Sequence, residues 1–127
     1  MKSQPSITHQ PFENDEPTSV LKQTADQAAA ALLTTFRRNA TVRFNSGGGS
    51  GGAFLLLDSD PVKTVGISLN ELVNGQIHIH AYIGIDFLQN KARANKGIGT
   101  SSYLYEQVAS LNEALDLLKN LSNLETY

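Results

Sequence analysis

The side chains best suited to chemistry lie on a segment of strictly alternating character, Gln76–Phe87 (QIHIHAYIGIDF). Successive side chains of a β-strand point to opposite faces, so the alternation predicts a long, half-buried strand. One face carries isoleucines, Ala81 and Phe87, and the other carries polar side chains that include His78, His80 and Tyr82. The polar face is the first candidate for a functional site.

Two of these side chains, His78 and His80, have a spacing that suits a metal ion. Residues i and i+2 of a strand project in parallel from Cα atoms about 6.5–7 Å apart, so both imidazoles could reach one ion. A third ligand is needed, and Glu71 is a candidate because a tight hairpin at Asn74-Gly75 would place it opposite His78. Histidines on a solvated face are more often ordinary surface residues. We therefore expect no metal site, with His78, His80 and Glu71 as the weaker candidates for one.

Catalytic motifs are not evident around these histidines. General acid–base catalysis would pair one of them with a neighbouring carboxylate or tyrosine. The sequence contains no cysteine, which excludes thiolate metal sites, cysteine nucleophiles and disulfides. It also lacks the His-Glu-x-x-His motif of zinc proteases. We expect a protein that is not an enzyme and that needs no cofactor.

Tyrosines add to the polar face through a second predicted strand, Thr100–Gln107, in which Leu104 faces the core. If this strand pairs with the alternating segment, Tyr82, Tyr103 and Tyr105 share a face with the two histidines. Rigid amphipathic rings are typical of hot spots in protein interfaces. They are also typical of stacking platforms for single-stranded nucleic acid, and in the simplest case such rings only support one another on an open sheet.

A basic loop, residues 89–99, connects these two strands and contains Lys91, Arg93 and Lys96. Basic residues at this density usually form a solvated loop tip. Beside an aromatic sheet face they could also follow a phosphate backbone. The net charge of −2 argues neither for nor against a polyanionic partner.

Two amphipathic helices are predicted to flank the strands. The first begins at Asp15-Glu16-Pro17, where an acid can cap the helix and proline suits its first turn, and runs to about Arg38. The second opens with the capping box Ser110–Glu113. Their apolar stripes recur at three- and four-residue spacing. The stripes consist of Leu21, Ala25, Ala28, Ala29, Leu32 and Phe36 in the first helix, and Leu111, Ala114, Leu115, Leu118 and Leu121 in the second.

Shorter strands are predicted at 41–44, 53–57 and 63–68. The segment 53–57 is apolar on both faces, which favours a central place in the sheet. Residues 69–73 either continue a strand toward the Asn74-Gly75 turn or form a short helix behind the capping box Ser68–Glu71. Residues 46–52 are all glycine or serine, which is typical of an engineered linker, with a natural glycine loop as the alternative.

The order helix, about five strands, helix predicts an α+β protein of two layers. Its sheet is antiparallel or mixed, and both helices pack on one face. We expect a disordered or loosely attached tail at 1–17 and a single domain at 18–127. The first 20 residues do not resemble a signal peptide, and no segment approaches the about 20 apolar residues that span a bilayer. A soluble, cytoplasmic protein that does not bind membranes is expected.

These features favour a non-enzymatic protein-interaction domain, such as an inhibitor, an adaptor or a subunit of a complex. It would bind a protein partner, or a second copy of itself, through the His/Tyr sheet face and the basic loop. The first alternative is binding of single-stranded nucleic acid by the same face. The second alternative is a small enzyme or metal protein that uses His78 and His80.

Overall fold

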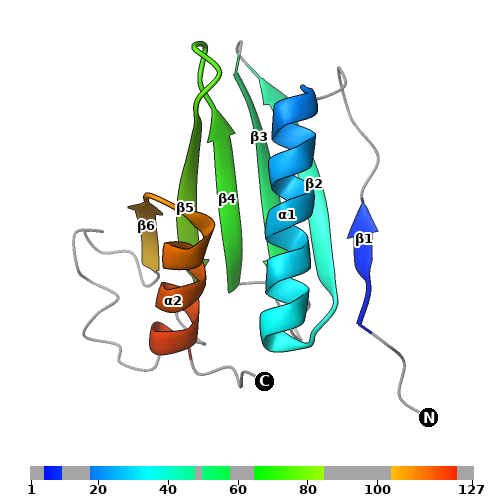
Figure 1. Cartoon of the computed structure of the whole chain (residues 1–127), viewed down its shortest axis with the longest axis vertical. Helices are drawn as coiled ribbons and strands as arrows, with labels where there is room; N and C mark the ends of the chain where they lie inside the picture. The colour runs from blue at the N-terminus through cyan, green and yellow to red at the C-terminus, as the bar shows by residue number, and fades with distance from the viewer. Residues whose placement is uncertain (1–4, 10–17, 48–49, 58–64, 85–103, 123–127) are drawn as a thin grey trace.

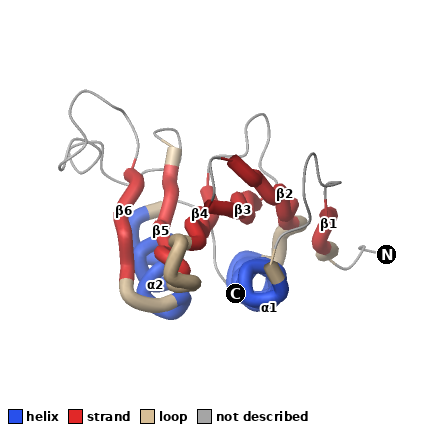
Figure 2. Tube along the Cα trace, turned by 90° about the horizontal axis from the view of Figure 1, so that it is seen from above, coloured by secondary structure: helices blue, strands red, loops and turns tan. Residues whose placement is uncertain are grey.

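A computed structural model describes residues 5–9, 18–47, 50–57, 65–84 and 104–122 of the chain. Six strands form one mixed sheet, in which the spatial order follows the chain order, and two helices cover one face (Figure 1). The view from above shows both helices on the same side of the sheet (Figure 2). This arrangement confirms the predicted two-layer α+β class. The elements are β1 (Ile7–His9), α1 (Ser19–Phe36), β2 (Ala40–Gly47), β3 (Ser50–Leu57), β4 (Val65–Glu71), β5 (Ile77–Ile83), β6 (Leu104–Val108) and α2 (Leu111–Leu121).

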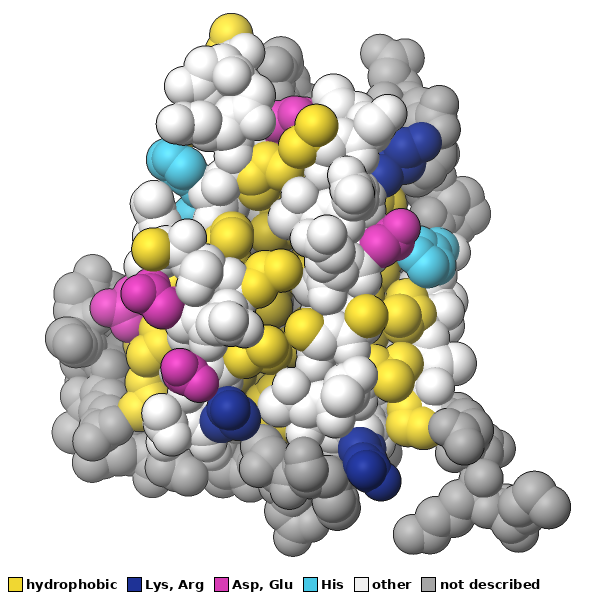
Figure 3. Space-filling view, in the orientation of Figure 1, with side chains coloured by type: hydrophobic (Ala, Val, Ile, Leu, Met, Phe, Trp, Pro, Cys, Tyr) yellow, Lys and Arg dark blue, Asp and Glu magenta, His cyan; other side chains and the backbone are white. Residues whose placement is uncertain are grey.

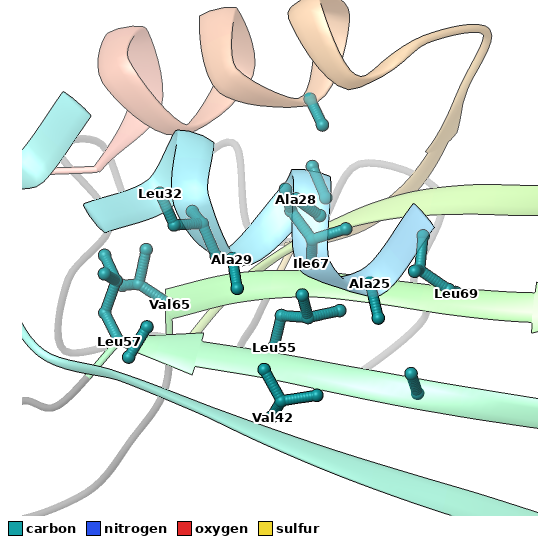
Figure 4. Packing of buried hydrophobic residues seen from close by; sticks show 14 of the residues in the cluster. Ala25, Ala28, Ala29, Leu32, Val42, Leu55, Leu57, Val65, Ile67 and Leu69 are labelled. Atoms are coloured by element: carbon teal, nitrogen blue, oxygen red, sulfur yellow. The ribbon is translucent and has the colours of Figure 1, made fainter. Parts of the chain in front are cut away.

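Helix α1 buries its predicted stripe completely, and its alanines allow the helix to lie close to β3 and β4 (Figure 4). The start of the helix differs from the prediction. Its N-cap is Thr18, whose hydroxyl accepts the Leu21 N–H at 3.1 Å, whereas Asp15-Glu16-Pro17 lies outside the described residues. The helix ends at Phe36, because Arg37 adopts a left-handed conformation (φ 53°) and its N–H bonds the Leu33 carbonyl.

The cap of α1 is also tied to the sheet. The Thr18 hydroxyl lies 2.8 and 3.0 Å from the two carboxylate oxygens of Glu71, at the end of β4, and donates to that group. We expect Thr18→Ala to lower the free energy of unfolding by about 1–2 kcal/mol, because the helix loses its cap and Glu71 loses its donor. Urea denaturation would measure this loss.

The matched control is Thr24→Ala within the same helix. The Thr24 hydroxyl donates only to the Val20 carbonyl one turn earlier, and alanine is the better helix former. Thr24→Ala should lower the free energy of unfolding by less than about 0.5 kcal/mol. Equal losses for the two substitutions would show that the Thr18 cap contributes nothing particular.

The N-terminal segment contributes a strand that the sequence did not predict. Ile7–His9 forms β1 and pairs in parallel with Ala40–Val42 at the start of β2. Ile7 packs against the core, and the His9 imidazole lies 3.3 Å from the Asp26 carboxylate on α1. Residues 7–9 of the expected tail at 1–17 thus form a strand, while residues 1–4 and 10–17 lie outside the described part. The sheet has six strands instead of about five for this reason.

The glycine–serine run belongs to a β-hairpin. Ser46 and Gly47 end β2, and Ser50–Gly52 begins β3, with Gly47 opposite Ser50 in the register. Strand β3 lies between β2 and β4, which confirms the central place predicted for 53–57. The glycine–serine run thus extends the pairing of β2 with β3. Its origin as an engineered linker stays a prediction.

The ambiguous segment at 69–73 continues as strand through Glu71, and no helix follows Ser68. The Gly75 N–H bonds the Leu72 carbonyl, and the Leu72 N–H bonds the Gln76 carbonyl, so the connection is one residue longer than a two-residue turn. The extra residue shifts the register, and Glu71 pairs with Ile77. The predicted position of Glu71 opposite His78 is therefore wrong, because Asn70 occupies it.

Strand β5 and helix α2 complete the layers as predicted. Ala81 and Ile83 are buried beneath α2 and the neighbouring strands, while Ile77 and Ile79 are half-buried. Helix α2 begins at the predicted capping box: Ser110 accepts the Glu113 N–H, and the Glu113 carboxylate accepts the Ala109 N–H. From the helix side, apolar side chains are visible between the two helices (Figure 3). The polar residues of β5 therefore face away from both helices.

Candidate functional site

The face of the sheet opposite the helices, called here the open sheet face, carries the candidate site. Residues that pair directly across neighbouring strands share a face, so the register places its side chains in rows. No element within the described ranges covers this face (Figure 2). One row consists of Arg43, Phe54, Ser68, His80 and Gln107, and the next consists of Thr41, Leu56, Gly66, Tyr82 and Tyr105.

Three rings from β5 and β6 meet on this face and form what we call the ring cluster: His80, Tyr82 and Tyr105. The Tyr105 ring stacks on the His80 imidazole with centroids 4.5 Å apart and an interplanar angle of 11°. Tyr82 lies directly across from Tyr105, and their rings meet edge-to-face at 6.3 Å and 73°. Both arrangements are favoured for aromatic pairs. Tyr105 is the shared member, and 37% of its surface remains exposed.

Tyr105 also reaches past its neighbouring strand. Its hydroxyl donates to the Ser68 hydroxyl on β4 at 3.4 Å, so the side chain from β6 crosses over β5. Ser68 is only 2% exposed although it lies on the open sheet face. Ser68 was not selected from the sequence, where one of the two alternatives for this segment made it the cap of a short helix that does not form.

His80 has an unusual environment for a histidine on a sheet face. Its Nδ1 atom is buried and has no hydrogen-bond partner among the described residues. Burial, and to a lesser extent the charge of neighbouring His78, lowers the pKa of the His80 imidazole below its ordinary value. The neutral form is therefore favoured, with the proton on Nε2 because a proton on Nδ1 would leave a buried donor unpaired.

The structure brings together part of the predicted site. His78, His80, Tyr82 and Tyr105 share the open sheet face, as the alternation predicted. The remaining predicted binding residues, Tyr103, Lys91, Arg93 and Lys96, lie outside the described residues. Phe54 and Arg43 were not selected from the sequence, although Phe54 is 38% exposed on the same face. Only the strand register reveals that they share it.

The candidate metal ligands do not form one group. Glu71 pairs with Ile77 on the helix-bearing face and binds Thr18, whereas His78 and His80 point to the open sheet face. Throughout the described ranges, no cluster of three histidine or acidic side chains could hold a metal ion. Glu71 is therefore excluded as a shared ligand of the two histidines.

Charge is sparse on the open sheet face. Of the lysine, arginine, aspartate and glutamate side chains on the described strands, only Arg43 lies there, because Glu71 and Glu106 point to the helix side. Within the described strands, the face therefore combines aromatic and small polar side chains with one cation, Arg43. Such a composition resembles the core of a protein interface, where charged residues are depleted and tyrosine, phenylalanine and arginine are enriched.

Comparison with protein-family models, with the curated proteins and with the solved structures gives no match. Neither helix in the described part of the chain is long and apolar enough to cross a membrane.

Proposed function

We propose that this chain is a non-enzymatic protein-interaction domain, such as an inhibitor, an adaptor or a subunit of a complex. The observation that carries the proposal is the ring cluster, which presents a stacked and partly exposed Tyr105 on an open sheet face. Tyrosine rings bury a large area with few rotatable bonds, so they lose little entropy on binding. Because stacking already orders the Tyr105 ring, a partner would meet a preorganised surface.

The chemistry around the ring cluster supports a protein partner over a nucleic acid. Phe54 offers a further exposed ring, and Arg43 opposite it is the single lysine or arginine on this face within the described strands. A surface that follows a nucleic-acid strand needs several cations along the phosphate backbone. In our proposal, the basic loop with Lys91, Arg93 and Lys96 contributes at the rim of the interface, where charge steers encounter and choice of partner.

The direct test is the triple substitution of Tyr82, Tyr103 and Tyr105 by alanine. The partner is first captured from the native host with the full chain and then purified. We expect it to bind the triple variant at least about 100-fold more weakly than the parent chain, because hot-spot truncations each cost about 2 kcal/mol or more. Titration calorimetry with the purified partner would measure the loss. Light scattering of the chain alone would identify a partner that is a second copy.

The matched control replaces Gln23 and Gln27 by alanine on the exposed side of α1, away from the open sheet face. This variant should bind like the parent chain, and circular dichroism should show that both variants are folded. Unchanged affinity of a folded triple variant would overturn the proposal. Tight, salt-dependent binding of a labelled single-stranded oligonucleotide, lost when Lys91, Arg93 and Lys96 become glutamate, would favour the nucleic-acid alternative instead.

A further inference from the structure

We propose that His80 is a proton-operated switch in the ring cluster. Binding of a proton at its Nδ1 atom releases Tyr105 from the stack and exposes His80 and Ser68 on the open sheet face. The consequence for binding rests on the function proposed above, because that face would present ordered rings at neutral pH and a cationic, disordered patch at acidic pH. The switch itself is a property of the chain alone.

Protonation changes the number of hydrogen-bond donors on the His80 imidazole. A neutral imidazole carries one N–H, and protonation turns both ring nitrogens into donors. The Nδ1 atom of His80 is buried and has no acceptor among the described residues. Protonation therefore creates a buried, charged donor without a partner, which is among the more costly arrangements in a protein. The conformation in which Tyr105 covers the imidazole accommodates only the neutral form.

Cation–π attraction between the imidazolium and the Tyr105 ring opposes the release of Tyr105. That attraction is small where the aromatic side chain is partly solvated, and Tyr105 is 37% exposed. The hydration that Nδ1 loses by burial is not replaced by a hydrogen bond among the described residues. The lowered pKa of His80, caused first by burial, agrees with desolvation as the larger effect.

Among the described residues, the surroundings of His80 offer no negative charge that would stabilise the imidazolium. Within the described strands, the side chains around it on this face are neutral or cationic. On β5 itself, protonation of His78 would add repulsion, and Arg43, the nearest fixed charge in its row, has the same sign. The neighbours from β4 are Ser68 and Asn70, and those from β6 are Tyr105 and Gln107. Release of Tyr105, which lets Nδ1 reach water, is then the available response.

The test is an NMR titration of the full chain, without any partner. The chain has three histidines, and His9→Asn and His78→Asn variants assign the imidazole signals. We expect His80 to titrate below its ordinary value of 6.5, and the Tyr105 ring signals to move from stacked to solvent-exposed shifts with the same midpoint. His78→Asn should raise the midpoint of the His80 titration, because the charge of His78 lowers the pKa of His80. The Tyr105 signals should still change with the same midpoint as His80 in this variant.

Two further variants separate a switch from a merely structural contact. Tyr105→Ser removes the stacked ring and should raise the pKa of His80 toward its ordinary value. His80→Phe keeps a ring in the stack and should make the Tyr105 signals independent of pH. A Tyr105 signal that stays constant while His80 titrates, or a His80 pKa unaffected by Tyr105→Ser, would overturn the switch.

The pH dependence of folding stability follows from the difference in the pKa of His80 between the folded and the unfolded chain. Because folding lowers the pKa of His80, the unfolded chain binds more protons at this site. The stabilisation should be complete above pH 6.5, the unperturbed value, and should be lost as the pH falls toward the pKa of the folded state. His80→Phe should remove this part of the pH dependence. None of these readouts needs a partner, so failure of the switch and failure of the proposed interaction are distinguishable.

Discussion

Replacement of Gly66 by alanine should destabilise the protein by about 3 kcal/mol, the upper end of the usual range for steric overpacking. A Cβ atom at this position would overlap the carbonyl oxygen of Leu55 on the adjacent strand and would lie 2.9 Å from Cδ2 of Leu56. A backbone carbonyl in the middle of a sheet cannot move aside without separating β3 from β4. The added methyl group therefore disrupts strand pairing at the centre of the fold.

Urea denaturation of Gly66→Ala beside Gly75→Asn would test this expectation. Gly75 has a φ of 87° in the exposed turn between β4 and β5, and a Cβ there meets no atom within 4 Å. Asparagine tolerates left-handed backbone better than most residues, so this control should cost less than about 1 kcal/mol. A Gly66→Ala protein as stable as the parent would mean that β3 and β4 do not approach as closely as described.

The second large effect is expected for Ile83→Ala, at about 3 kcal/mol. Ile83 is completely buried, with Val65 on one side and Leu104 on the other in the strand register. Loss of its branched side chain leaves a cavity below the helix layer, and the surrounding strands cannot collapse into it without breaking their register.

The matched control lies on the same face of the same strand. Ile77 is only half-buried, near the β4–β5 turn, so Ile77→Ala should cost about 1 kcal/mol or less. The midpoints of thermal or urea unfolding would rank the two variants. Equal losses would show that the two ends of β5 are buried alike, and would contradict the packing described here.

These isoleucines illustrate what the sequence can and cannot provide. Alternation assigns Ile77, Ile79 and Ile83 to the same face of the sheet, because the direction of a side chain on a strand follows from local backbone geometry. It treats all three as equivalent, however. Their depth depends on where α2 ends above the sheet, and that is a tertiary property. The same logic placed His78, His80 and Tyr82 on the opposite face correctly.

The predicted position of Glu71 was wrong because the register between β4 and β5 differs from the one that a two-residue turn would give. Asn74-Gly75 predicts a turn, but the length of the connection depends on which conformation the flanking residues adopt. One added residue moved Glu71 to the helix side, where Thr18 binds it. The proposed metal group was lost in consequence, since a shift of one residue reverses the face of every side chain on a strand.

The open sheet face also contains residues that were not predicted from the sequence, and the reason is different. Ser68, Phe54 and Arg43 come from three strands that are separate in the sequence, and only sheet order places them in the same row as His80. The crossing of Tyr105 over β5 to Ser68 depends on a rotamer and on a long-range contact. Strand β1 escaped prediction because a three-residue segment among polar residues carries too little periodicity.

The strand order has a consequence for the way the chain folds. From β2 to β6, every strand pairs with its neighbour in the sequence, so the meander can grow one hairpin at a time with modest loop-closure entropy. Among the described strands, β1 alone pairs in parallel, and it cannot dock until α1 has turned back and β2 has formed. Although β1 is synthesised before β2, it therefore joins the sheet only after β2.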